Sequence, residues 1–192
     1  IGLLKLATGE RQDSPPLRGT RSMCAELAAH PSTAHLVGRP THFLSHAWLY
    51  KILNVLDALE DFEASQPDSN PPIFWWFDCF AIDEHATQTL SQEWWSTTFK
   101  EAIQMMGHTV MLLTPWDAPQ PLTRAWCLWE LHCTVETDSE FSIVLGPAEK
   151  VAFRDSLDNE NSERMLAVLS TIDVRKSQAG NPDDLKMILE AV

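Results

Sequence analysis

The sequence predicts an α/β fold in which a mostly parallel sheet carries helices on both of its faces. Short apolar segments alternate along the chain with longer segments whose apolar residues recur at helical spacing. The segment 73–77 is apolar without interruption, which is typical of a strand buried on both faces. The connections between apolar segments are long enough to hold crossover helices, so the strands are expected to run parallel.

The first half of the chain contains two strand–helix units. The helices are recognised by apolar side chains every three or four residues, as at Ile52, Val55, Leu56 and Leu59. The loops between the units are polar and contain Pro or Ser. We therefore expect a strand at 41–45, a helix at 48–63, a strand at 73–77 and a helix at 92–106.

The second half repeats this alternation. Gly107 is a plausible stop for the preceding helix, and Asn181 with Pro182 resembles a helix start. We expect strands at 108–114, 141–145 and 171–174, and helices at 123–136, 148–157, 163–169 and 183–191.

Length and composition indicate one domain. The 192 residues are 44% hydrophobic and include eight Trp and eight Phe, enough to bury a sizeable core. Residues 1–40 hold scattered Pro and Gly with one short helical pattern, so we interpret them as a lead-in packed on the edge of a domain at 41–192. Because the first residue is Ile1 rather than Met, the chain is expected to be a piece of a longer or processed protein.

Charge and cysteine usage exclude several classes of function. Fourteen basic residues against 27 acidic ones give a net charge of -13, which argues against a nucleic-acid partner. The cysteines show no CxxC pair or zinc-ribbon spacing and are expected to be reduced thiols. The sequence has neither a membrane-length apolar run nor a signal peptide, which favours a cytoplasmic protein without a membrane partner.

The segment 122–131 is the most informative part of the sequence. It places Trp126 and Glu130 one helical turn apart on a shared face, with Cys127 beside them. It follows the expected strand 108–114, and in an open α/β sheet ligands bind at the carboxyl ends of the strands. An acid beside an aromatic wall would suit a ring-bearing substrate.

Motifs in three consecutive units resemble those of TIR domains. The first strand ends in Ser45-His46, the second ends in Asp78, and the third unit carries Trp126-Cys127-Leu128-x-Glu130-Leu131. The chain is especially similar to divergent TIR-like domains of algal and protist proteins. This similarity covers roughly residues 41–146, and its further segments are Ser45-His46-Ala47-Trp48, Trp94-Trp95, Pro115-Trp116 and Leu122-Thr123-Arg124-Ala125.

The resemblance implies a flavodoxin-like, five-stranded sheet and, in the catalytic branch of the family, cleavage of the nicotinamide–ribose bond of NAD+. Glu130 matches the catalytic glutamate, and Trp126 matches an aromatic position beside the bound nucleotide. The other residues expected at the substrate are Ser45, His46, Trp48 and Asp78. NAD+ would be a substrate, so no cofactor and no metal are expected.

Other interpretations of the same residues remain open. Glu130 alone could be a solvated helix residue, and Trp126 and Trp129 could simply pack. Cys127 has apolar neighbours and is expected in the core. Arg124 could meet a phosphate or pair with Asp117. A metal ion could be bound by His46, Asp78, Asp83, His85 and Glu130, but the spacing of these residues in the sequence is not that of a known metal site.

The leading prediction is therefore a TIR-like NAD+ hydrolase of intracellular signalling or defence, which releases nicotinamide and ADP-ribose or a cyclic ADP-ribose. The alternative is a non-catalytic adaptor that assembles with itself or with other TIR-like domains. The adaptor is favoured by the acidic surface and by the loop 81–91, which lacks the glycine-containing turn that relatives often carry. A nucleotide sensor that does not cleave is a third possibility.

Overall fold

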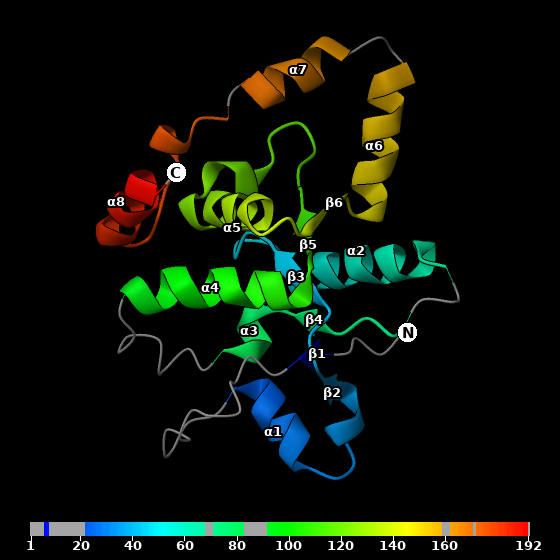
Figure 1. The fold of residues 1–192 in the computed structure, drawn as a ribbon. Helices are drawn as coiled ribbons and strands as arrows, with labels where there is room; N and C mark the ends of the chain where they lie inside the picture. The colour runs from blue at the N-terminus through cyan, green and yellow to red at the C-terminus, as the bar shows by residue number, and fades with distance from the viewer. Residues whose placement is uncertain are drawn as a thin grey trace.

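The structure is a computed structural model that describes residues 6–7, 22–67, 71–82, 92–158, 162–170 and 172–191. Within these residues, six strands form one sheet in the order β2-β1-β4-β3-β5-β6, and every pair is parallel (Figure 1). The strands are β1 Leu6–Ala7, β2 Val37–Gly38, β3 His42–Ser45, β4 Trp75–Trp76, β5 His108–Leu112 and β6 Glu140–Val144.

Eight α-helices lie in the described residues, together with short 3-10 turns. None of these helices combines the length and the apolar character that a bilayer span requires. The helices are α1 Met23–Ala29, α2 Ile52–Ser65, α3 Asp78–Ala81, α4 Gln92–Met106, α5 Ala125–Glu136, α6 Pro147–Asp158, α7 Ser162–Ser170 and α8 Pro182–Ala191, and the 3-10 turns are η1 Ala34–Leu36, η3 Gln120–Thr123 and η4 Val174–Lys176.

Four neighbouring strands of the sheet, β4-β3-β5-β6, follow the order of a flavodoxin-like sheet. The chain runs from β3 to β4, crosses back over β3 to β5, and continues outward to β6. The strand order therefore reverses between β3 and β5, and the carboxyl ends of these two strands mark the place where such folds bind ligands.

The predicted α/β class is confirmed, but the predicted set of five strands is not. The expected strand at 171–174 is wrong in its described residues, because Val174 begins η4 and the Asp173 side chain caps this turn by accepting from the Arg175 amide at 3.1 Å. The sheet instead gains β1 and β2, two strands of two residues each, beyond β4.

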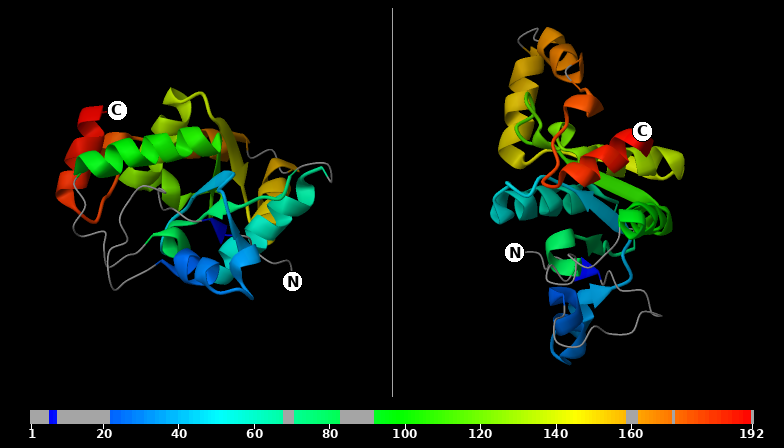
Figure 2. Two further views of the ribbon diagram at one scale, coloured as in Figure 1. Left: turned by 60° about the horizontal axis from the view of Figure 1, so that its bottom comes forward. Right: turned by 90° about the vertical axis from the view of Figure 1, so that its left-hand side faces the viewer.

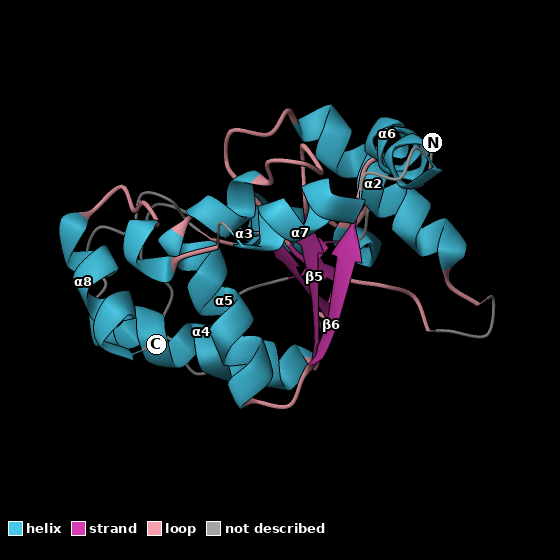
Figure 3. Cartoon of the chain, turned by 90° about the horizontal axis from the view of Figure 1, so that it is seen from above, coloured by secondary structure: helices cyan, strands magenta, loops and turns pink. Residues whose placement is uncertain are grey.

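Helices cover both faces of the sheet, as predicted. Figure 3 shows α2 and α6 on one side of the strands and α4 and α5 on the other. The adjacent indoles of β4 divide between these faces: the Trp75 ring lies 5.6 Å from Phe62 of α2, and the Trp76 ring lies 5.7 Å from Phe99 of α4. Both indoles are buried, which explains the uninterrupted apolar segment.

Parts of residues 1–40 pack at the β4 edge of the sheet. The Ser22 hydroxyl caps α1 by accepting from the Ala25 amide at 3.2 Å, and Cys24 of this helix is fully buried. At Gly38 of β2, an added Cβ would come within 2.6 Å of the Phe74 ring, so glycine permits the close approach. Figure 2 shows α1 at the end of the molecule opposite α6 and α7.

Candidate functional site

The carboxyl ends of β3 and β4 bring the predicted site residues to one edge of the sheet. Ser45 ends β3 opposite Met111 of β5, and His46 follows it directly. Asp78 comes two residues after β4, at the first position of α3. Helix α5 packs against α4 and β5 and carries Glu130 to the same edge.

Glu130 and Ser45 both present unpaired polar atoms at this edge. Ser45 is fully buried, and its Oγ has no hydrogen-bond partner among the described residues. Glu130 is half-buried as a residue, but its Oε2 is enclosed and likewise lacks a partner within the described ranges. The Trp129 Nε1 of the same helix is a third buried side-chain atom without a partner in the described residues. Because unsatisfied polar atoms in an interior are rare and costly, the pair formed by Ser45 and Glu130 at a ligand-binding edge favours a functional site.

Burial raises the pKa of Glu130 to about 8, from an ordinary value of 4.5. The Asp78 charge contributes to this rise in the pKa, whereas the Ser45 hydroxyl and the Arg124 charge partly oppose it. The Ser45 hydroxyl thus lies near enough to the Glu130 carboxyl to lower its pKa, although its Oγ forms no hydrogen bond with a described residue. The Glu130 carboxyl is mostly neutral at pH 7 in the unliganded structure.

Arg124 is the cation of the site. It precedes α5, and its charge lowers the pKa of Glu130, of Cys127 and of His46. The structure shows no ion pair for Arg124 with Asp117 or with any other described carboxylate. Its guanidinium therefore remains available to an anionic group of a ligand.

His46 is buried next to the Asp78 carboxylate. Its ring meets Phe77 edge-on at 4.8 Å, and its Nε2 lies 3.7 Å from Asp78 Oδ1. Burial lowers the pKa of His46, although the Asp78 charge partly opposes this effect. The imidazole is consequently neutral at pH 7 and can accept or donate through either nitrogen according to its tautomer.

Asp78 also joins Trp48 to the site. The Trp48 indole N–H donates to Asp78 Oδ2 at 2.6 Å, and the Cys79 amide donates to Oδ1 at 2.7 Å. Trp48 is 58% exposed, so its ring stands at the surface beside the carboxyl ends of the strands. It precedes α2, which begins at Ile52 rather than at the predicted residue 48.

Trp126 is engaged in packing between helices. Its ring centroid lies 5.6 Å from that of Phe99 in α4, and its indole N–H donates to Asp184 Oδ2 of α8 at 3.1 Å. The contact with α8 could not be seen in the sequence, because 58 residues separate the two partners. Trp126 therefore helps to pack α4, α5 and α8 together, in addition to any role in ligand binding.

Two further residues of α5 belong to the core. The Cys127 thiol lies 3.4 Å from the His46 carbonyl, and burial raises the pKa of this thiol, so it is a poor nucleophile. Trp129 is 6% exposed and packs with the other core residues. None of the four cysteines forms a disulfide.

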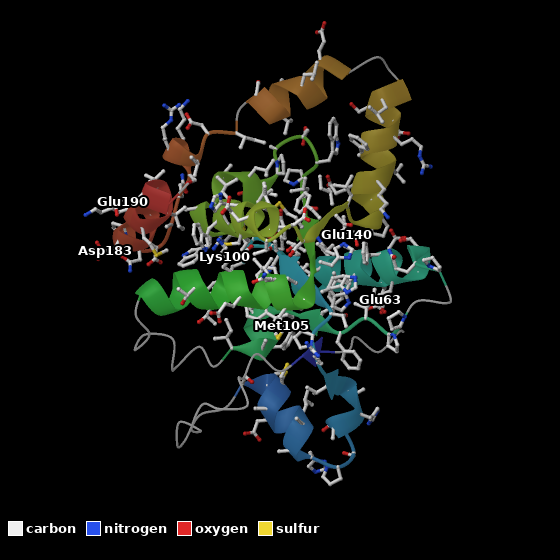
Figure 4. The ribbon with its side chains drawn as sticks, in the orientation of Figure 1. Glu63, Lys100, Met105, Glu140, Asp183 and Glu190 are labelled. Atoms are coloured by element: carbon white, nitrogen blue, oxygen red, sulfur yellow. The ribbon has the colours of Figure 1, made fainter. Side chains whose placement is uncertain are left out.

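Contacts from its C-terminal half hold helix α5 against α4 and β5. Lys100 of α4, labelled in Figure 4, pairs with Glu136 in the last turn of α5 at 3.6 Å. In the interior, the hydroxyls of Thr134 and Thr109 lie 2.8 Å apart, and the Thr134 hydroxyl donates to the Glu130 carbonyl at 2.7 Å. These contacts fix the helical turn that carries Glu130.

We expect Thr134→Val to lower the free energy of unfolding by about 1–3 kcal/mol, because it leaves the fully buried Thr109 hydroxyl without its partner. The double variant Thr109→Val with Thr134→Val removes both groups and is expected to recover most of this loss. Urea denaturation of the three proteins measures the effect. A double variant less stable than Thr134→Val alone would contradict the proposed contribution of the hydroxyl pair.

A separate pocket of about 270 Å³ lies where α2, β5 and α6 meet. The Tyr50 hydroxyl donates to the Thr114 carbonyl at 2.6 Å at its wall. Glu130 and Ser45 do not line this pocket. The candidate site is therefore defined by the buried polar atoms of these two residues and not by the pocket. The lining residues are Tyr50, Asn54, Asp57, Leu112, Thr114, Gly146, Pro147, Ala148 and Glu149.

The structure also brings Cys79 to the site, which the sequence analysis did not select. Its ligand atom lies within 4.8 Å of those of His46 and Asp78. Of the candidates weighed for a metal site, Asp83 and His85 lie outside the described residues, as do the side chains of Trp94 and Trp95.

Comparisons of the chain with family models, with characterised proteins and with solved structures found no match. The residues at the carboxyl edge of the sheet combine a titratable carboxyl, a buried hydroxyl without a partner in the described residues and the positive charge of Arg124 near a topological switch point.

Proposed function

We propose that the chain is a TIR-like, flavodoxin-like domain that hydrolyses NAD+ at its nicotinamide–ribose bond in the cytoplasm, with Glu130 as the catalytic residue. The observation that carries the proposal is the buried Glu130 Oε2 beside the buried Ser45 Oγ, neither of which has a hydrogen-bond partner among the described residues, at the edge where open α/β sheets bind ligands. The resemblance of the Trp126–Leu131 segment to TIR domains supplies the substrate.

The chemistry requires a negative charge next to a developing cation. As the bond between ribose C1′ and the pyridinium nitrogen breaks, nicotinamide leaves with the bonding electron pair and the ribose becomes oxocarbenium-like. A carboxylate at Glu130 stabilises this cation and orients the acceptor. Attack by water, which then loses a proton, gives ADP-ribose, whereas attack by an atom of the adenine ring gives a cyclic product.

The raised pKa of Glu130 is compatible with this role. A carboxyl that is neutral before binding requires no counter-ion in the buried site. The pyridinium ring of NAD+ carries a positive charge, and an opposite charge at close range favours the ionised carboxyl. Substrate binding would therefore generate the carboxylate where the cation forms.

Other residues of the site would bind the rest of the dinucleotide. The Ser45 hydroxyl can hydrogen-bond to a ribose hydroxyl, and Arg124 can pair with the pyrophosphate. His46, Trp48 and Asp78 border the site from β3 and α3. Trp126 retains a substrate-binding role in the proposal through its match to the family position, next to Phe99.

The adaptor function has one observation in its favour. Four apolar side chains in the loop before α2 and in its first turn are exposed in the structure, with Leu49 83% and Leu53 69% accessible. The group comprises Trp48, Leu49, Ile52 and Leu53. A cluster of this kind is suited to association with another copy or with another TIR-like domain.

Nicotinamide release from NAD+ by the purified chain tests the proposal. We expect release in a chromatographic assay, with a rate that rises more steeply than linearly with protein concentration if assembly completes the site. Leu49→Asp would then reduce the rate at low concentration and not at high concentration. If no nicotinamide forms at any protein concentration, the hydrolase is refuted and the adaptor is favoured.

A further inference from the structure

We propose that His46, Asp78 and Cys79 form a binding site for a zinc ion. The three side chains offer an imidazole nitrogen, a carboxylate oxygen and a thiol sulfur, and these atoms all lie within 4.8 Å of one another. They come from two neighbouring strands: His46 follows β3, and the other two residues begin α3 after β4. This site goes beyond the proposed NAD+ cleavage and does not depend on it.

The spacing of the ligand atoms suits a tetrahedral ion. With bonds of about 2.0–2.3 Å, tetrahedral geometry places ligand atoms roughly 3.3–3.8 Å apart. The separation between His46 Nε2 and Asp78 Oδ1 is 3.7 Å and already falls in this range. Cys79 is exposed, so its Sγ can close the remaining gap by rotation about its Cα–Cβ bond.

The donor set selects the metal. Imidazole and thiolate are ligands of zinc and of similar transition metals, whereas calcium and magnesium prefer oxygen alone. On binding, the Cys79 thiol gives its proton to solvent and the resulting thiolate forms the metal–sulfur bond. Three protein ligands leave the fourth position open to water or to an exogenous ligand.

Neighbouring groups orient two of the ligands. The Trp48 indole N–H holds Asp78 Oδ2 at 2.6 Å, which leaves Oδ1 on the side of His46. The His46 ring meets the Phe77 ring edge-on, with the ring centroids 4.8 Å apart, which restricts the orientation of the imidazole. Such contacts fix the orientation of metal-binding side chains.

Titration calorimetry with Zn²⁺, together with the absorption spectrum of the Co²⁺ form, tests the site. We expect one equivalent of Zn²⁺ per chain, and a Co²⁺ spectrum with a thiolate charge-transfer band and the intense visible bands of tetrahedral coordination. Cys79→Ser is expected to abolish the charge-transfer band and to weaken Zn²⁺ binding at least 100-fold. His46→Gln should weaken Zn²⁺ binding to a similar extent.

The matched control is His35→Gln, which alters an exposed histidine remote in sequence from the site and should leave binding unchanged. Circular dichroism verifies that each variant folds; because Cys79 is exposed, its serine variant is expected to do so. The proposal is overturned if the wild-type chain binds no Zn²⁺, if Cys79→Ser binds it as tightly as the wild type, or if the Co²⁺ form lacks the thiolate band.

Discussion

Replacing Glu130 by glutamine is expected to lower the rate of nicotinamide release from NAD+ by about 100-fold or more, the usual effect of removing one preorganised electrostatic group. The amide keeps the size of the side chain but cannot become negatively charged as the ribosyl cation forms. The binding of NAD+ should change much less, because the contacts to its ribose and pyrophosphate come from other residues. The measurement is kcat and KM from chromatographic quantification of nicotinamide.

The matched control is Glu136→Gln, on the same helix. Glu136 is exposed and its ion pair with Lys100 lies at the surface, so its loss should leave the rate unchanged and cost little stability. Equal rates for wild type and Glu130→Gln would show that Glu130 is not the catalytic residue. A fall in rate for both variants would instead point to a general effect of helix α5.

The helices were largely predictable because their signals are local. The predicted helix 92–106 coincides with α4, since its apolar spacing ends at Gly107, whose φ of 73° is the left-handed conformation that terminates helices. The strand 171–174 failed because an apolar pair does not decide between a strand and a turn. Local contacts from Asp173 to Arg175 stabilise the turn instead.

The strand at 171–174 was expected but is not formed, whereas the short strands β1 and β2 are formed but were not expected. Two-residue strands carry no periodic pattern, and their stability comes from pairing with β4 and with each other. The edge at β6 is left without a further partner strand in the described part of the sheet, and Ile143 of this strand is 57% exposed. The presence of β1 and β2 and the exposure of the β6 edge both depend on which strands pair, and this pairing joins segments that are distant in the sequence.

The location of the site could be predicted from the sequence, but several of its side-chain contacts could not. The rule that ligands bind at the carboxyl ends of strands located Ser45, His46 and Asp78 correctly at one edge. The rule could not show that Trp126 bonds to Asp184, or that Cys79 approaches His46. Both contacts depend on the packing of elements that are distant in sequence.

The pH dependence of stability is expected to differ between wild type and Glu130→Gln. Glu130 has a pKa raised to about 8 in the folded chain, above its ordinary value of 4.5. Between these values the unfolded chain releases the proton and the folded chain keeps it, so the free energy of unfolding falls as pH rises. The loss begins near pH 4.5 and is complete above about pH 8.

Across this window we expect the wild type to lose on the order of 5 kcal/mol relative to Glu130→Gln, whose amide does not titrate. Urea denaturation of both proteins at pH 5, 7 and 9, followed by circular dichroism, measures this difference, because contributions from all other groups cancel between them. A difference in stability that stays constant with pH would mean that Glu130 ionises normally in the folded chain. Such a result would remove the physical basis for a neutral carboxyl that is converted to a carboxylate by a cationic substrate.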